Sequence, residues 1–134
     1  GFVVVSRTHT VGDIVTVQGI EIEAIAAYNT EKQFHPKSAG YVGFVAHTGG
    51  HTLYVAGDTD ATPELKAVKA DVVMLPVGGH YTMGAEEAAE GANAIKPKLA
   101  IPLHFGDIIG SEADAQRFGA ACTVPIRILQ PERP

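Results

Sequence analysis

The chain has 134 residues, of which 46 % are hydrophobic and 19 % are charged, and its formal net charge is −5. This composition is typical of a globular protein, so we expect a single domain over residues 1–134. Its ten lysine and arginine residues are scattered rather than clustered, which argues against nucleic acid as a partner. The apolar run near the start is too short for a membrane span, and the single cysteine, Cys122, fits a reducing compartment such as the cytoplasm.

The first half of the chain has the alternating apolar and polar pattern of β-strands. A polar loop over 29–40 divides this half into two pairs of strands, each joined by a turn. The first pair turns at Gln18-Gly19 and the second at 48–50. The four strands are expected at 13–17, 20–25, 41–46 and 52–56. This arrangement predicts a β-meander.

The second half alternates between strand and helix patterns. A short helix is expected over 63–69, where Pro63 lies in the first turn and Thr62 can cap it. Apolar residues at helical spacing predict a second helix from Ala85, which Pro97 ends. Further strands are expected at 71–76, 99–103 and 124–129, with a third helix at 112–121. The predicted fold class is therefore α/β, a β-meander followed by βαβ units.

Two predicted strands end in side chains that can bind a metal ion. Asp58 follows the strand that ends at Ala56-Gly57, and His104 follows the apolar run 99–103. Ligands of α/β sheets bind at the carboxyl ends of strands, and carboxylate and imidazole groups form hydrolytic zinc or manganese sites. The alternatives are that Asp58 only caps its turn and that His104 is a hydrogen-bonded structural residue.

Other histidines have less support from their surroundings. His80 and Tyr81 lie in a glycine-containing loop at the same expected sheet edge, where they are either catalytic or part of a plain connection. His35 lies in the long polar loop, and long loops in compact domains often carry function. His47 and His51 flank a turn at the opposite end of their strands, so we do not expect them to bind a metal ion.

Several short motifs follow one another along the chain: Ala27-Tyr28-Asn29, Phe34-His35-Pro36-Lys37, Gly40-Tyr41-Val42-Gly43-Phe44, Ala56-Gly57-Asp58-Thr59-Asp60, Leu75-Pro76-Val77-Gly78-Gly79, Tyr81-Thr82-Met83, Glu86-Glu87-Ala88 and Ile101-Pro102-Leu103-His104. Their order and spacing resemble the C-terminal part of metallo-β-lactamase-fold metal-dependent hydrolases, especially the branch similar to ascorbate-6-phosphate lactonase. The resemblance implies an αββα sandwich with one or two divalent metal ions, Zn or Mn, at its edge.

The resemblance also implies roles for individual residues. Asp58 would bridge both metal ions, and His104 would be the late histidine of the second ion. His35 is the expected middle histidine, although Asn29 stands near the position where many relatives have it. His80 departs from the threonine expected in this branch and is an additional candidate for a ligand or an acid.

The HxHxDH motif of this family does not occur in the sequence. The resemblance implies that this motif supplies most of the metal ligands, so we expect an incomplete site. The chain is then part of a hydrolase that cleaves a lactone, ester or phosphoester of a small molecule, or else a non-catalytic remnant or assembly module. A second copy of the chain or a complementing N-terminal half is expected to cover the open sheet.

Overall fold

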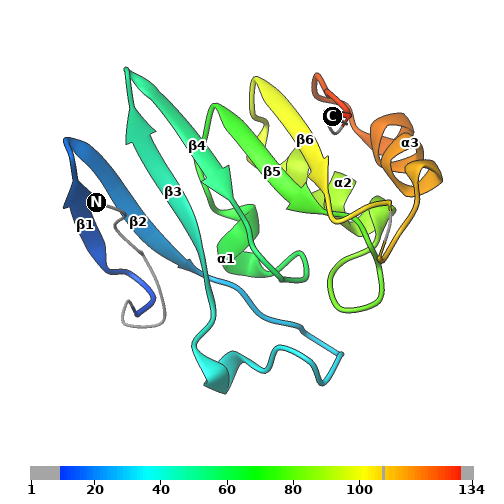
Figure 1. Ribbon diagram of the computed structural model, residues 1–134, viewed down its shortest axis with the longest axis horizontal. Coiled ribbons are helices and arrows are strands. Elements are labelled where there is room, and N and C mark those ends of the chain that lie inside the picture. The colour runs from blue at the N-terminus through cyan, green and yellow to red at the C-terminus, as the bar shows by residue number, and fades with distance from the viewer. Residues whose placement is uncertain (1–9, 107, 131–134) are drawn as a thin grey trace.

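The computed structural model describes residues 10–106 and 108–130, so 1–9, 107 and 131–134 of the expected domain lie outside the described residues (Figure 1). One six-stranded sheet has the order β1-β2-β3-β4-β5-β6. Its strands are β1 (Ile14–Val17), β2 (Ile20–Ala26), β3 (Val42–Thr48), β4 (His51–Val55), β5 (Val72–Pro76) and β6 (Leu99–Leu103). The helical elements of the described residues are η1 (Lys37–Ala39), α1 (Pro63–Lys66), α2 (Ala85–Ile95) and α3 (Glu112–Ala121).

The sheet changes from antiparallel to parallel at β4. Strands β1 to β4 pair antiparallel with their neighbours along the chain, whereas β5 pairs parallel with both β4 and β6. Parallel neighbours need crossover connections, and these contain α1 and α2. The predicted α/β class, a β-meander followed by βαβ units, is confirmed.

The expected strand at 124–129 does not form. Only Ile126 makes an isolated bridge, to Ala100 on β6. The backbone N–H of Ala100 donates to the carbonyl oxygen of Pro125, and that of Arg127 donates to the carbonyl oxygen of Ala100. Pro125 has no N–H to donate on one side of this bridge and Pro102 of β6 has none on the other, so the pairing stays short.

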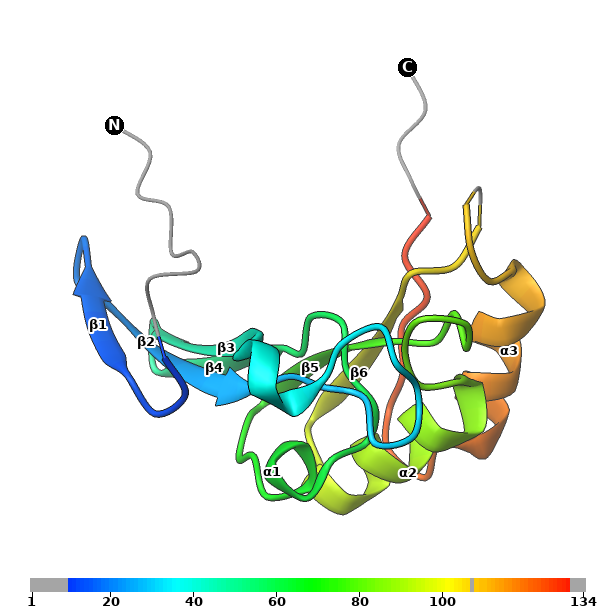
Figure 2. The same cartoon turned by 90° about the horizontal axis from the view of Figure 1, so that it is seen from below.

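The helices α1, α2 and α3 gather on one side of the sheet (Figure 2). There they bury a core that includes Tyr54 of β4, Leu65 of α1 and Phe118 of α3, each 0 % exposed. Helix α2 faces this core with small side chains, and a Cβ added at its Gly91 would lie 2.9 Å from Cδ2 of Leu65. Small residues therefore let α2 pack closely on the sheet. None of the helices in the described part of the chain is long and apolar enough to cross a membrane.

The helices α1, α2 and α3 leave the other side of the sheet uncovered (Figure 2), and its strands carry apolar side chains there. The strand register aligns them in two rows across β3 to β6. We call this surface the open face; it consists of Phe44, Leu53, Val55, Val72, Met74, Leu99 and Ile101. Of these, Ile101 is 8 % exposed and the others are partly exposed. A single sheet with helices on one side is half of the layer arrangement expected for an αββα sandwich.

Candidate metal site

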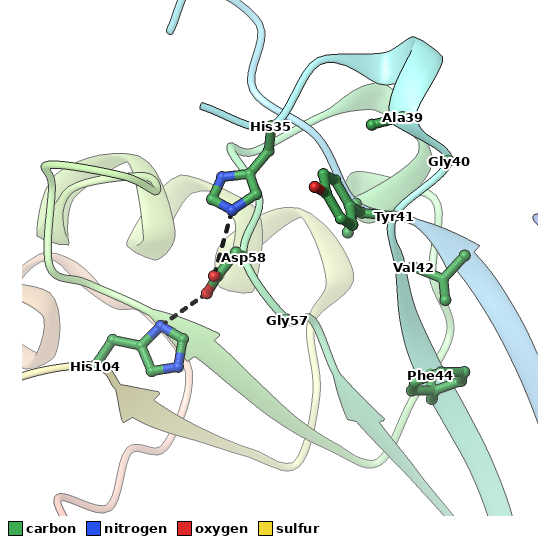
Figure 3. Close-up of a pocket in the computed structure, with 10 residues that line it drawn as sticks. His35, Ala39, Gly40, Tyr41, Val42, Phe44, Gly57, Asp58 and His104 are labelled. Carbon is green, nitrogen blue, oxygen red and sulfur yellow. Dashed lines mark ion pairs between the residues drawn. The ribbon is translucent and has the colours of Figure 1, made fainter. Parts of the chain in front are cut away.

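Asp58 and His104 lie just beyond the carboxyl ends of β4 and β6, with β5 between these two strands. Gly57 has a φ of 69°, which only glycine adopts readily, and it turns the chain so that Asp58 follows at the sheet edge. His104 itself has a φ of 56°, a conformation that costs a non-glycine residue energy and that clusters at functional sites. Its Nδ1 lies 3.2 Å from Oδ1 of Asp58 (Figure 3).

His35 approaches the same carboxylate from the loop between β2 and β3. Its Nε2 lies 3.4 Å from Oδ2 of Asp58 (Figure 3). Its Nδ1 lies 3.3 Å from the carbonyl oxygen of Tyr81. A carbonyl oxygen only accepts hydrogen bonds, so Nδ1 must carry the proton in this contact. In the neutral ring, the lone pair of Nε2 then faces a carboxylate oxygen. A cation between the two atoms would turn this repulsion into attraction.

Asn29 holds His35 and its carbonyl partner in place. The Nδ2 group of Asn29 donates to the carbonyl oxygen of Tyr81 at 2.9 Å and to Oδ1 of Asp60 at 3.0 Å. Its Oδ1 accepts from the backbone N–H of His35 at 2.9 Å. The buried Asn29 amide is therefore occupied by protein partners, and the side chain that faces Asp58 is His35.

Asp60 supports this network from below the surface. Its side chain is 2 % exposed and lies 2.9 Å from the ammonium group of Lys32. Burial by itself raises the pKa of this carboxyl group. Hydrogen bonds from Lys32, Thr30 and Asn29 outweigh that effect and hold the pKa of Asp60 below its ordinary value. Asp60 is therefore charged at neutral pH and fastens the start of the long loop.

The two oxygens of Asp58 face two different histidines. Among the described residues, no group of three or more His, Cys, Asp or Glu side chains is arranged to hold one metal ion. The site is instead two pairs that share a carboxylate, which is the arrangement expected of a ligand between two ions. The side chains of Asp58 and His104 are 46 % and 49 % exposed, so both remain open to further ligands.

Two cavities meet at this site, and both are lined by Asp58 and His104. The first cavity, about 720 Å³, lies beside the open face; its other lining residues are Ala27, His35, Ala39, Gly40, Tyr41, Val42, Phe44 and Gly57. The second cavity, about 460 Å³, is lined in addition by Tyr81, Thr82, Phe105, Ile108 and Ile109. These cavities give small molecules access to Asp58 from two directions.

Tyr41 is a site residue that sequence reasoning did not select. Its ring lies edge-on to the His35 ring, with the ring centres 5.4 Å apart, and it lines the first cavity (Figure 3). Tyr41 is part of a motif that carried the family resemblance, but nothing in its local sequence indicates chemistry. Only the folding of the long loop back over β3 brings it to His35.

Tyr81, His80 and His51 do not contact Asp58 through their side chains in the way that His35 and His104 do. Tyr81 reaches the second cavity, and its backbone holds His35. His80 is exposed and packs against the rings of Phe34 and Tyr81, at centre distances of 5.5 Å and 4.5 Å; it is not among the described residues that line either cavity. His51 lies at the far end of β4, where its Nδ1 is 3.9 Å from Oδ2 of Asp71.

Residues 3–104 match the family model of the beta-lactamase superfamily domain. The chain belongs to the metallo-β-lactamase superfamily. Within this superfamily, a UPF0173 metal-dependent hydrolase of Thermoplasma acidophilum is 36 % identical over 126 residues, which are 90 % of this chain and 56 % of that protein. The chain spans about half the length of the curated relatives it matches.

Solved structures of the superfamily share the fold. One from Parabacteroides distasonis, assigned as a metal-dependent hydrolase, matches with a TM-score of 0.76 and 34 % identity over 87 % of this chain and 54 % of that one. Another, assigned as a Zn-dependent hydrolase of Thermotoga maritima, has a TM-score of 0.67 over 87 % of this chain and 68 % of that one. At 22 % identity the second match shows the fold alone.

The matches confirm the expected superfamily and a chain of reduced length. They show similarity to UPF0173 metal-dependent hydrolases, but they do not support the expected position in the C-terminal part of such proteins.

Proposed function

We propose that this chain supplies one side of a two-metal centre that hydrolyses an ester, a lactone or a phosphoester of a small molecule. The observation that carries the proposal is the placement of Asp58, whose two oxygens face Nε2 of His35 at 3.4 Å and Nδ1 of His104 at 3.2 Å. The names of the relatives as metal-dependent hydrolases support the same reaction class.

The donor set fits zinc or manganese. Asp58 would be shared between two ions, with His35 as a ligand of one and His104 as a ligand of the other. Bound divalent ions polarise a substrate oxygen and lower the pKa of water. The hydrogen bond from Nδ1 of His35 to the carbonyl oxygen of Tyr81 leaves Nε2 free to bind, which is the usual way in which protein groups orient a histidine ligand.

Tyr81 and His80 would act at the substrate end of the site. Tyr81 lines the second cavity together with Asp58, so it would contact a substrate bound there. His80 packs on the ring of Tyr81, so its influence would pass through that ring. Tyr81 is therefore a proposed catalytic group, and His80, which would act through Tyr81, is a proposed positioning residue.

The site needs ligands from outside this chain. A catalytic zinc ion has about three protein ligands, whereas the three side chains here would be divided between two ions. The chain covers 56 % of its Thermoplasma relative, so we propose that the remaining ligands come from the part that this relative has in addition. The open face is the surface on which a second sheet would pack.

The competing function, favoured by that same apolar face, is a non-catalytic assembly module that binds a second copy of itself.

Complementation tests the proposal. The chain alone, with added zinc or manganese, should hydrolyse lactones, aryl esters and phosphodiesters little or not at all. Adding the part of the Thermoplasma relative that this chain does not match should restore turnover and metal content, measured by elemental analysis.

Matched variants decide between the two functions. Asp58→Ala and His104→Ala should lose the metal and the restored activity, whereas His51→Ala, at the far end of β4, should keep both. Restored metal binding without turnover would favour the assembly module. Robust metal-dependent turnover by the chain alone would show that its own residues complete the site.

A further inference from the structure

We infer that the second cavity binds the apolar part of a neutral ester or lactone, an inference that rests on the proposed function and names its substrate class. The cavity is lined by Tyr81, Thr82, Phe105, Ile108 and Ile109 and ends at Asp58 and His104. It is therefore continuous with the proposed metal site. A substrate whose reacting carbonyl group reaches Asp58 would direct one of its substituents into this cavity.

The wall of the cavity offers apolar contact rather than hydrogen bonds. Phe105 and Ile109 supply hydrocarbon surface, and Ile108 is 95 % exposed at its mouth. The hydroxyl group of Thr82 donates to the carbonyl oxygen of Met83 at 3.4 Å, so its proton is directed away from a ligand. A volume of about 460 Å³ lies within the range of small-molecule sites.

An exposed aromatic pair extends this apolar surface beyond the cavity. Tyr81 and Phe34 are 41 % and 49 % exposed, and their rings meet edge-to-face with centres 4.7 Å apart. Apolar side chains that gather in this way beside a polar site favour binding of an apolar group. A substituent longer than the cavity would continue along these rings.

Beside the proposed ions, the described residues of this chain's own cavity walls offer no free cationic side chain to hold a phosphate group. Of the described residues that line the two cavities, none is lysine or arginine. The lysines of the neighbouring long loop are already paired, Lys32 with Asp60 at 2.9 Å and Lys37 with Glu64 at 2.7 Å. Phosphate recognition uses free lysine or arginine groups. Of the three proposed substrate classes, esters and lactones therefore fit this chain better than phosphoesters.

A pair of lactones tests the inference on the chain as it is. γ-Butyrolactone and γ-octalactone have the same ring, but only the second has a four-carbon tail. Each fully buried methylene raises affinity about fourfold, so a four-carbon tail that is half-buried should raise it about 15-fold. Amide chemical shifts of the 15N-labelled chain report both affinities and should move at Thr82, Phe105 and Ile109.

Two exposed isoleucines provide a matched pair of variants. Ile108→Asn should lower the affinity for γ-octalactone several-fold and leave that for γ-butyrolactone unchanged. Ile14→Asn, on β1 at 60 % exposure, should change neither. Equal affinities for the two lactones, or shifts confined to the open face, would overturn the inference. A tail preference with no metal binding by the complemented chain would retain the apolar cavity and count against the hydrolase, whereas metal binding by the complemented chain without a tail preference would do the reverse.

Discussion

Replacing Gly78 with alanine should displace His104 and weaken metal binding. Gly78 lies just after β5, and a Cβ added there would be 2.8 Å from the carbonyl oxygen of His104 and 2.9 Å from Cγ2 of Ile109. Cβ contacts this short essentially do not occur, so one partner must move. The oxygen belongs to the backbone of the proposed ligand, and the φ of 56° at His104 leaves that backbone little freedom to adjust.

The size of the effect follows from the nature of this contact. Overpacking costs about 1–3 kcal/mol, and a clash with backbone on one side places Gly78→Ala at about 2 kcal/mol of lost unfolding free energy. Displacing a ligand through its supporting contacts typically lowers metal affinity about 10- to 100-fold. We therefore expect Gly78→Ala to weaken zinc affinity by about tenfold or more.

Urea unfolding of the chain followed by circular dichroism measures the first effect, and zinc competition with a chromophoric chelator on the complemented chain measures the second. Gly84→Ala is the control, because Gly84 lies in the same loop, has a φ of −81°, and would place its Cβ 4.0 Å from the nearest atom. It should cost about 0.5–1 kcal/mol, because alanine is a poorer N-cap than glycine, and it should leave the zinc affinity unchanged. If Gly78→Ala keeps wild-type zinc affinity, this contact does not position His104 and the reasoning is refuted.

Two further outcomes concern stability and association. Hydrogen bonds from Lys37 and Tyr28 lower the pKa of Glu64 from 4.5 to about 2, so its stabilisation is complete above pH 4.5 and is lost as the pH falls toward 2. Because this carboxylate is 34 % exposed, Glu64→Gln should cost only about 1 kcal/mol at neutral pH, and urea unfolding should show that difference disappear in acid. The open face should make the isolated chain dimerise or form higher oligomers, and Met74→Lys, at its centre, should shift the population toward monomer. Light scattering that shows a well-folded wild-type monomer at about 50 µM would contradict this expectation.

Local sequence patterns were sufficient to predict most of the sheet. Alternation and short apolar runs located β1, β5 and β6 to within about a residue of their bounds, because the direction of each side chain along a strand repeats every second residue. The same pattern over 124–129 was misleading. A strand also needs a partner ladder, and Pro125 cannot donate to one, so the tertiary structure allows only the bridge at Ile126.

The candidate site was likewise predictable from the sequence only in part. The sequence by itself determined that Asp58 and His104 share an edge, because both follow strands whose carboxyl ends point in one direction. Only the tertiary structure decided that His35 joins them and that His80 faces outward. The ring of His35 is oriented by the carbonyl oxygen of Tyr81, 46 residues away, and its backbone N–H is held by the side-chain amide of Asn29. No local periodicity encodes such contacts, because they form only when the long loop packs against the loop after β5.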